Sequence, residues 1–155
     1  MAEFKSGFVA IIGRTNVGKS TLINKLVGEK VAITVNKSQT TRTAIRAIVN
    51  RENSQIIFID TPGVHKPKTK LGETMIETAY EIAEDVDIIL FIVDCSKKEI
   101  TKGDRIILEK IKEINRKTIL ILNKIDLIQK EDILKVIDMY RKEYEFEEII
   151  PISAL

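Results

Sequence analysis

The sequence contains very little cysteine: one residue, Cys95, in a chain of 155. A single thiol excludes an intramolecular disulfide and a zinc site built from several cysteines, and it fits a reducing compartment. The apolar runs, such as Ile88–Val93, are much shorter than the roughly 20 residues that a membrane-spanning helix needs. The first five residues lack the apolar stretch of a signal peptide. These absences predict a cytoplasmic protein and leave peripheral contact with the inner face of the cell membrane open.

Neither sign of charge is in large excess, because 25 Lys and Arg stand against 23 Asp and Glu, a net charge of +2. This balance excludes a protein that binds polyanions over its whole surface. The distribution is less even, since residues 1–78 carry +6 and residues 79–155 carry −4. An anionic ligand is therefore expected in the first half. Internal repeats, low-complexity tracts and interior linkers are also missing, so residues 1–155 are predicted to form one domain.

Apolar β-branched runs alternate with segments of helical periodicity along the chain. Strands are expected at residues 8–12, 43–49, 55–59, 88–93, 118–122 and 149–152, and helices at 19–27, 72–85, 104–115 and 130–144. This order predicts a three-layer α/β fold with a six-stranded, mostly parallel sheet. The second and third strands read as a hairpin, which gives one antiparallel edge strand. An alternating chain would add a closing helix after the last strand, and we expect this helix to be absent.

The segment after the first strand reads GRTNVGKS and matches the phosphate-loop pattern G-x-x-x-x-G-K-[ST]. Glycines let backbone N–H groups turn towards phosphate oxygens, and the helix that follows points the positive end of its dipole at them. Lys19 would reach the β- and γ-phosphates, and the Ser20 hydroxyl would bind Mg²⁺. The residues expected to contact the nucleotide here are Gly13, Arg14, Thr15, Asn16, Val17, Gly18, Lys19, Ser20 and Thr21.

A base-reading pattern lies at the ends of the last two strands. Asn123, Lys124 and Asp126 form N-K-x-D, in which a buried Asp126 carboxylate would accept from guanine N1–H and its 2-amino group. Adenine offers no matching pair of donors. Ser153 and Ala154 follow the last strand, where the Ala154 N–H can meet the guanine carbonyl. Since open α/β sheets bind ligands at the carboxyl ends of their strands, the two patterns together predict a guanine nucleotide.

Two further segments are expected to sense the γ-phosphate. Asp60 would hold Mg²⁺ through water, and the Gly63 N–H would meet the γ-phosphate, with Thr61 and Pro62 between them. The polar loop 36–43 would donate a threonine hydroxyl to Mg²⁺ when GTP is bound. Thr41 is the preferred ligand, and Thr40 is the alternative. Mg²⁺ would thus be held by Ser20, Thr41 and Asp60, and catalysis would depend on Lys19, Thr41 and Gly63.

With these motifs the chain resembles translation-factor-type GTPases, and most closely the Era family. The narrower markers are the Asn16-Val17 pair, the segment Gln39–Arg42 and the segment Asp60–Pro67, which reads DTPGVHKP. Thr15 departs from the pattern, because the family usually has proline there. The resemblance covers the whole chain and implies the G-domain fold of P-loop NTPases.

The resemblance also implies function and partners. Era-family membership implies a bacterial GTPase that acts in 30S ribosomal subunit assembly and binds the end of 16S ribosomal RNA. Family members carry a C-terminal KH-type RNA-binding domain, for which these 155 residues leave no room. Resemblance to potassium-dependent relatives suggests that Asn16 holds K⁺ near the β- and γ-phosphates, and the alternative is that Asn16 only shapes the loop.

Rival hypotheses remain open at this point. The first hypothesis is a Mg²⁺-dependent GTPase switch, and the second is a GDP- and GTP-binding docking module with negligible hydrolysis. An ATP-specific P-loop kinase would lack the guanine reader that Asp126 suggests. His65, the one histidine, is either a catalytic base or a surface residue of the loop.

Overall fold

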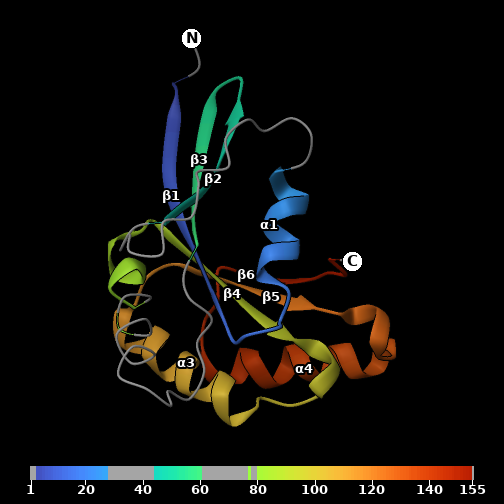
Figure 1. Cartoon of the computed structure of the whole chain (residues 1–155). Helices are drawn as coiled ribbons and strands as arrows, with labels where there is room; N and C mark the ends of the chain where they lie inside the picture. Colours follow the sequence, from blue (N-terminus) through green and yellow to red (C-terminus); the bar gives the residue numbers. More distant parts are fainter. Residues whose placement is uncertain (1–2, 28–43, 61–76, 78–79, 155) are drawn as a thin grey trace.

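A computed structural model describes residues 3–27, 44–60, 77 and 80–154, and within these it contains a six-stranded sheet (Figure 1). The strand order is β2-β3-β1-β4-β5-β6, with β2 antiparallel to β3 and the other neighbours parallel. The predicted mixed α/β sheet with one antiparallel edge strand is therefore confirmed. The strands are β1 (Lys5–Gly13), β2 (Ala44–Arg51), β3 (Ser54–Asp60), β4 (Ile88–Asp94), β5 (Thr118–Asn123) and β6 (Glu148–Pro151).

Three helices have complete bounds: α1 (Lys19–Val27), α3 (Lys102–Ile114) and α4 (Lys130–Glu143). Residues 80–85 are also helical, inside the helix expected at 72–85. Two short 3₁₀ turns follow strands, η1 (Cys95–Lys97) after β4 and η2 (Ile125–Leu127) after β5. Neither turn was predicted from the sequence. Among the described residues, no helix is both long and apolar enough to cross a membrane.

The two faces of the sheet bury separate cores, because successive side chains of a strand point to opposite sides. On β1, Ala10 and Ile12 join the core under α3 and α4, whereas Ile11 joins the core under α1. The same alternation runs along β4, where Phe91 faces α4 and Ile92 faces α1. Figure 1 shows α1 apart from α3 and α4, as this division requires. The strands thus form the middle layer of three.

Helix α3 illustrates why the local sequence folds as it does. Thr101 caps the N-terminus, and its side chain accepts from the Asp104 N–H. Ile107, Leu108 and Ile111 form a buried stripe at helical spacing. The helix ends at Asn115, whose φ of 55° lies in the left-handed region. The helix therefore begins two residues before its expected start at 104, because the capping residue precedes the apolar pattern.

Candidate functional site

The carboxyl ends of the parallel strands meet at one edge of the sheet and bring the sequence motifs together. Gly13 ends β1 opposite Ile92 of β4, and Asn123 ends β5 opposite Asp94 of β4. The segment with Ala154 follows β6 directly. Residues that are about 110 to 140 positions apart in the chain therefore share one end of the sheet.

The loop between β1 and α1 needs glycine at two positions, Gly13 and Gly18. Gly18 has φ +106°, and a Cβ on it would overlap the Asn123 side-chain amide. A Cβ on Gly13 would lie 2.7 Å from the Ile92 carbonyl oxygen, so this position is also closed to larger residues. Asn16 has φ 65°, a left-handed conformation that asparagine tolerates better than most residues. The loop makes one left-handed step at Asn16 and a second positive-φ step at Gly18, just before α1 begins.

Asn123 is the buried link between two of the motifs, with only 3% of its surface exposed. Its Nδ2 donates to the Val17 carbonyl at 2.8 Å, and its Oδ1 accepts from the Ala154 N–H at 3.0 Å. One side chain therefore holds the phosphate loop and the segment after β6 at fixed positions. Replacing it would leave a buried carbonyl and a buried N–H without partners, which is costly.

Lys124 fixes the same loop from its solvent side. Its Nζ donates to the Asn16 carbonyl at 2.9 Å and to Asp94 Oδ2 at 3.2 Å. Burial alone would raise the pKa of Asp94, but hydrogen bonds from the Ser96 hydroxyl and N–H and from Lys124 lower it below its ordinary value. The carboxylate thus stays charged beside the ammonium group. Asp94 was missed in the sequence, where it appears only as the residue after an apolar run.

Asp126 lies in η2 and is exposed, whereas a buried carboxylate was expected. The 3₁₀ turn after β5 carries its side chain to the surface, where Oδ1 accepts from the Ser153 hydroxyl at 2.8 Å. The N–H of Ile125 also donates to the Ile152 carbonyl at 3.2 Å. The N-K-x-D and Ser153-Ala154 segments are therefore paired through both side chains and backbone, with Asp126 open to a ligand.

The residues expected to hold Mg²⁺ are described only in part. Ser20 is exposed in the first turn of α1. The backbone of Asp60 ends β3, paired with Ile11 of β1, and nothing is described of its side chain. The remaining residues of these segments lie outside the part of the chain that the structure describes: Thr40, Thr41, Thr61, Pro62, Gly63 and His65. An exposed hydroxyl suits Mg²⁺, which prefers oxygen ligands and usually keeps several waters beside carboxylates and substrate phosphates. No group of three His, Cys, Asp or Glu side chains within the described ranges could hold a metal unaided.

The remaining phosphate-loop residues differ in what they contact. Lys19 is half-buried at the start of α1, and Thr15 and Thr21 are exposed. Val17 is buried in the core under α1. Arg14 turns away from the loop, since its Nη1 donates to the Thr101 hydroxyl at 3.1 Å. Thr101 belongs to none of the predicted motifs.

Comparison with known proteins identifies the family of this chain. Residues 8–124 match the family model described as "50S ribosome-binding GTPase". The chain is 56% identical over 153 residues to GTPase Era of Clostridioides difficile (strain 630), covering 98% of this chain and 51% of that relative. It thus spans about half the length of this curated relative.

Two solved structures resemble the fold closely. The first is Era in complex with MgGDPNP and nucleotides 1506–1542 of 16S ribosomal RNA, with a TM-score of 0.82 and 43% identity. The matched region covers 99% of this chain and 52% of the Era chain. The second is a variant of Aquifex aeolicus Era bound to GDP and AlF₄⁻, with a TM-score of 0.77 and 41% identity over 98% of this chain and 52% of that one.

Proposed function

The chain belongs to the family of 50S ribosome-binding GTPases, and we propose that it binds GTP and GDP with Mg²⁺ and hydrolyses GTP to GDP and phosphate. In this proposal GTP hydrolysis is a timer that separates two states of the protein. The solved relatives that carry MgGDPNP or GDP with AlF₄⁻ support this choice of ligand.

One observation carries the proposal: the Asn123 side chain joins the phosphate loop to the segment after β6. The contact places the loop that would hold phosphates beside the two segments that would read the base. Asp126, hydrogen-bonded to Ser153 and exposed, is available to accept from guanine donors. This combination favours a nucleotide that carries both phosphates and guanine over a phosphate alone.

Different residues of the chain would bind the phosphates and Mg²⁺. Backbone N–H groups of the Gly13–Ser20 loop and the Lys19 ammonium group would bind the phosphates, and the Ser20 hydroxyl would hold Mg²⁺. Mg²⁺ held there would neutralise negative charge on the bound phosphates. Thr41, Asp60 and Gly63 are proposed to complete this site, with Thr40 as the alternative to Thr41.

Hydrolysis by the isolated chain is expected to be slow. Many GTPases have a glutamine after D-x-x-G that orients the attacking water, and this sequence has Val64 there. Valine cannot hydrogen-bond to water, so we expect turnover of about 10⁻⁴–10⁻² s⁻¹, as in unassisted GTPases.

The test combines binding with turnover. Fluorescent GDP should bind in the presence of Mg²⁺ and be displaced by GDP and not by ADP. Multiple-turnover phosphate release from GTP separates the enzyme from a docking module, which would bind equally well and release almost none. Displacement by ADP would contradict the guanine assignment.

We also propose that this activity serves assembly of the small ribosomal subunit in the cytoplasm. The support is similarity to Era, one structure of which contains a 16S ribosomal RNA fragment. Co-sedimentation with 30S subunits in GTP-analogue and GDP states tests the partner, and cell fractionation tests the location, peripheral membrane contact included. If the same fraction of the chain sediments with and without 30S subunits, the proposed partner is wrong.

A further inference from the structure

The side chain of Arg14 leaves the phosphate loop and lies on the first turn of α3. Its Nη1 donates to Thr101 Oγ1 at 3.1 Å. The same hydroxyl accepts from the Asp104 N–H at 3.1 Å and donates to Asp104 Oδ2 at 2.8 Å. A hydroxyl has one hydrogen and two lone pairs, so these three contacts use its full capacity. Within α3 the hydroxyl donates one hydrogen bond and accepts one, which leaves one lone pair. Arg14 donates to this lone pair from outside the helix.

Gly103 provides the space for this contact. A Cβ on Gly103 would lie 2.7 Å from Arg14 Nε and 2.9 Å from its Cδ, closer than real contacts allow. The atoms that would have to move belong to a flexible side chain and not to backbone. The first turn of α3 is thus shaped around the guanidinium group.

Asp104 is the negative group that shares the Thr101 hydroxyl with Arg14. It is 1% exposed, and its Oδ1 has no hydrogen-bond partner among the described residues. Burial raises the pKa of Asp104, while the Thr101 hydrogen bond and the positive charge of Arg14 lower it. A carboxylate that is buried and only partly satisfied costs stability, so helix capping alone does not explain it.

We propose that Thr101, Gly103 and Asp104 form a dock for Arg14 and are positioning residues for nucleotide binding, although they lie outside the sequence motifs. The inference rests on the proposed guanine-nucleotide site. The loop is then held at three successive points: Arg14 by α3, the Asn16 carbonyl by Lys124 and the Val17 carbonyl by Asn123. A loop held before the ligand arrives loses less conformational entropy when it binds, which raises affinity.

The variant Gly103→Ala tests the dock without weakening the helix. Alanine forms helices better than glycine, so the melting temperature of the nucleotide-free chain should fall less than in Arg14→Ala, which loses the same contact without this gain. The added methyl group displaces Arg14, and the dissociation constant for GDP should rise about 10–150-fold, the value of one hydrogen bond to a charged group. Most of this change should appear as faster GDP release in stopped-flow chase experiments.

The matched control is Lys102→Ala, an exposed position in the same turn that should leave GDP release unchanged. The decisive comparison adds Gly103→Ala to Arg14→Ala. If the methyl group acts through Arg14, the double variant should release GDP no faster than Arg14→Ala alone. If Gly103→Ala releases GDP at the wild-type rate, or if the effects of the two substitutions on GDP release are fully additive, the dock is wrong and the proposed function still stands. A wild-type chain that binds no GDP would overturn the proposed function, and the dock with it.

Discussion

At the scale of single residues, Asp126 is the group on which the choice of base depends. It is exposed, and Ser153 holds one of its oxygens, which leaves the other oxygen and the remaining lone pairs for a ligand. In Asp126→Asn the carboxamide presents a donor where guanine also presents one. Sites built around such hydrogen bonds discriminate by roughly 10⁴–10⁵, so GDP binding should weaken strongly. Xanthosine diphosphate, which has a carbonyl in place of the 2-amino group, should bind the variant better than GDP does.

Competition titrations with fluorescent GDP and xanthosine diphosphate measure this exchange of preference. Ser153→Ala is a graded control, because it removes the hydrogen bond to Asp126 and keeps the carboxylate. It should weaken GDP binding far less than Asp126→Asn and leave the order of preference unchanged. Unaltered GDP affinity in Asp126→Asn would contradict the assignment of Asp126 as the base reader.

Asn16 is the residue on which a dependence on potassium would rest. Its carbonyl is already bound by Lys124, and its exposed side chain sits on a left-handed backbone in the phosphate loop. If the side chain coordinates K⁺, phosphate release should be faster in KCl than in NaCl at equal ionic strength. Asn16→Ala should then abolish the difference between the salts while it keeps GDP binding. Equal rates in both salts for the wild-type chain would exclude the potassium role.

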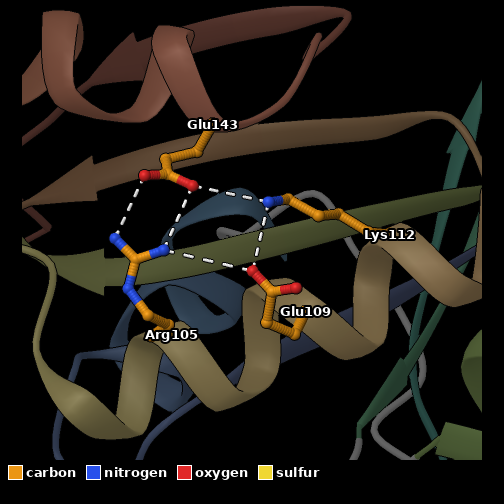
Figure 2. Close-up of polar contacts among 4 residues, drawn as sticks. All are labelled: Arg105, Glu109, Lys112 and Glu143. Atoms are coloured by element: carbon orange, nitrogen blue, oxygen red, sulfur yellow. Dashed lines mark hydrogen bonds and ion pairs between the residues drawn. The ribbon is translucent and has the colours of Figure 1, made fainter.

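At the scale of elements, an ion-pair network joins α3 to α4. Glu143 of α4 accepts from Arg105 through both carboxylate oxygens at 3.1 Å, and its Oε2 lies 3.4 Å from Lys112 Nζ (Figure 2). Glu109 lies between the two cations, 3.1 Å from Lys112 and 4.0 Å from Arg105. A bidentate pair inside a network is the arrangement in which surface ion pairs contribute measurably. The network should therefore orient α4 against α3.

Glu143→Gln should lower the melting temperature slightly at neutral pH, and less so in high salt, which screens exposed charges. The hydrogen bond from Arg105 is the main cause that lowers the pKa of Glu143. The Glu143 carboxylate therefore stabilises the fold at pH values above its ordinary pKa of 4.5. This stabilisation is lost as the pH falls through the lower pKa that Glu143 has in the folded chain. Wild-type and variant melting curves should converge under acid conditions, and Glu145→Gln, at an exposed position outside the network and after the end of α4, is the control. A difference that persists at low pH would contradict this account.

The elements themselves were largely predictable, and their ends were not. The run Ile88–Val93 predicted β4 to within one residue because a buried parallel strand needs continuous apolar side chains. Leu134 of α4 is 61% exposed although Ile133 beside it packs against the core, a difference that the local apolar pattern does not reveal. The partners of the motifs were least visible, because Asp94 and Asp104 act through contacts between distant segments that no local pattern records.

At the scale of the molecule, the two faces of the sheet are unequally covered in the described residues. One face packs against α3, α4 and residues 80–83, and the other packs against α1. On the α1 face Ile119 and Ile152 are only partly buried, and Ile150 of the edge strand β6 is 40% exposed. Each apolar side chain left partly in water forgoes some of the roughly 1.5–3 kcal/mol that full burial gives. Since domains are stable by only about 5–15 kcal/mol, the nucleotide-free chain should be marginal.

Guanine nucleotide should therefore raise the stability of the whole chain by a large fraction. The proposed ligand contacts segments at the ends of β1, β5 and β6, so it binds the folded state and not the unfolded one. At 1,000 times its dissociation constant, GDP would add about 4 kcal/mol. In a chain of this size this corresponds to a melting-temperature rise of roughly 8–16 °C. Thermal scans with Mg²⁺ and GDP, and with ADP as the matched control, measure the rise. A shift below about 2 °C at saturating GDP, or an equal shift with ADP, would contradict a coupling between the guanine site and the fold, because the free energy of ligand binding must appear as stability.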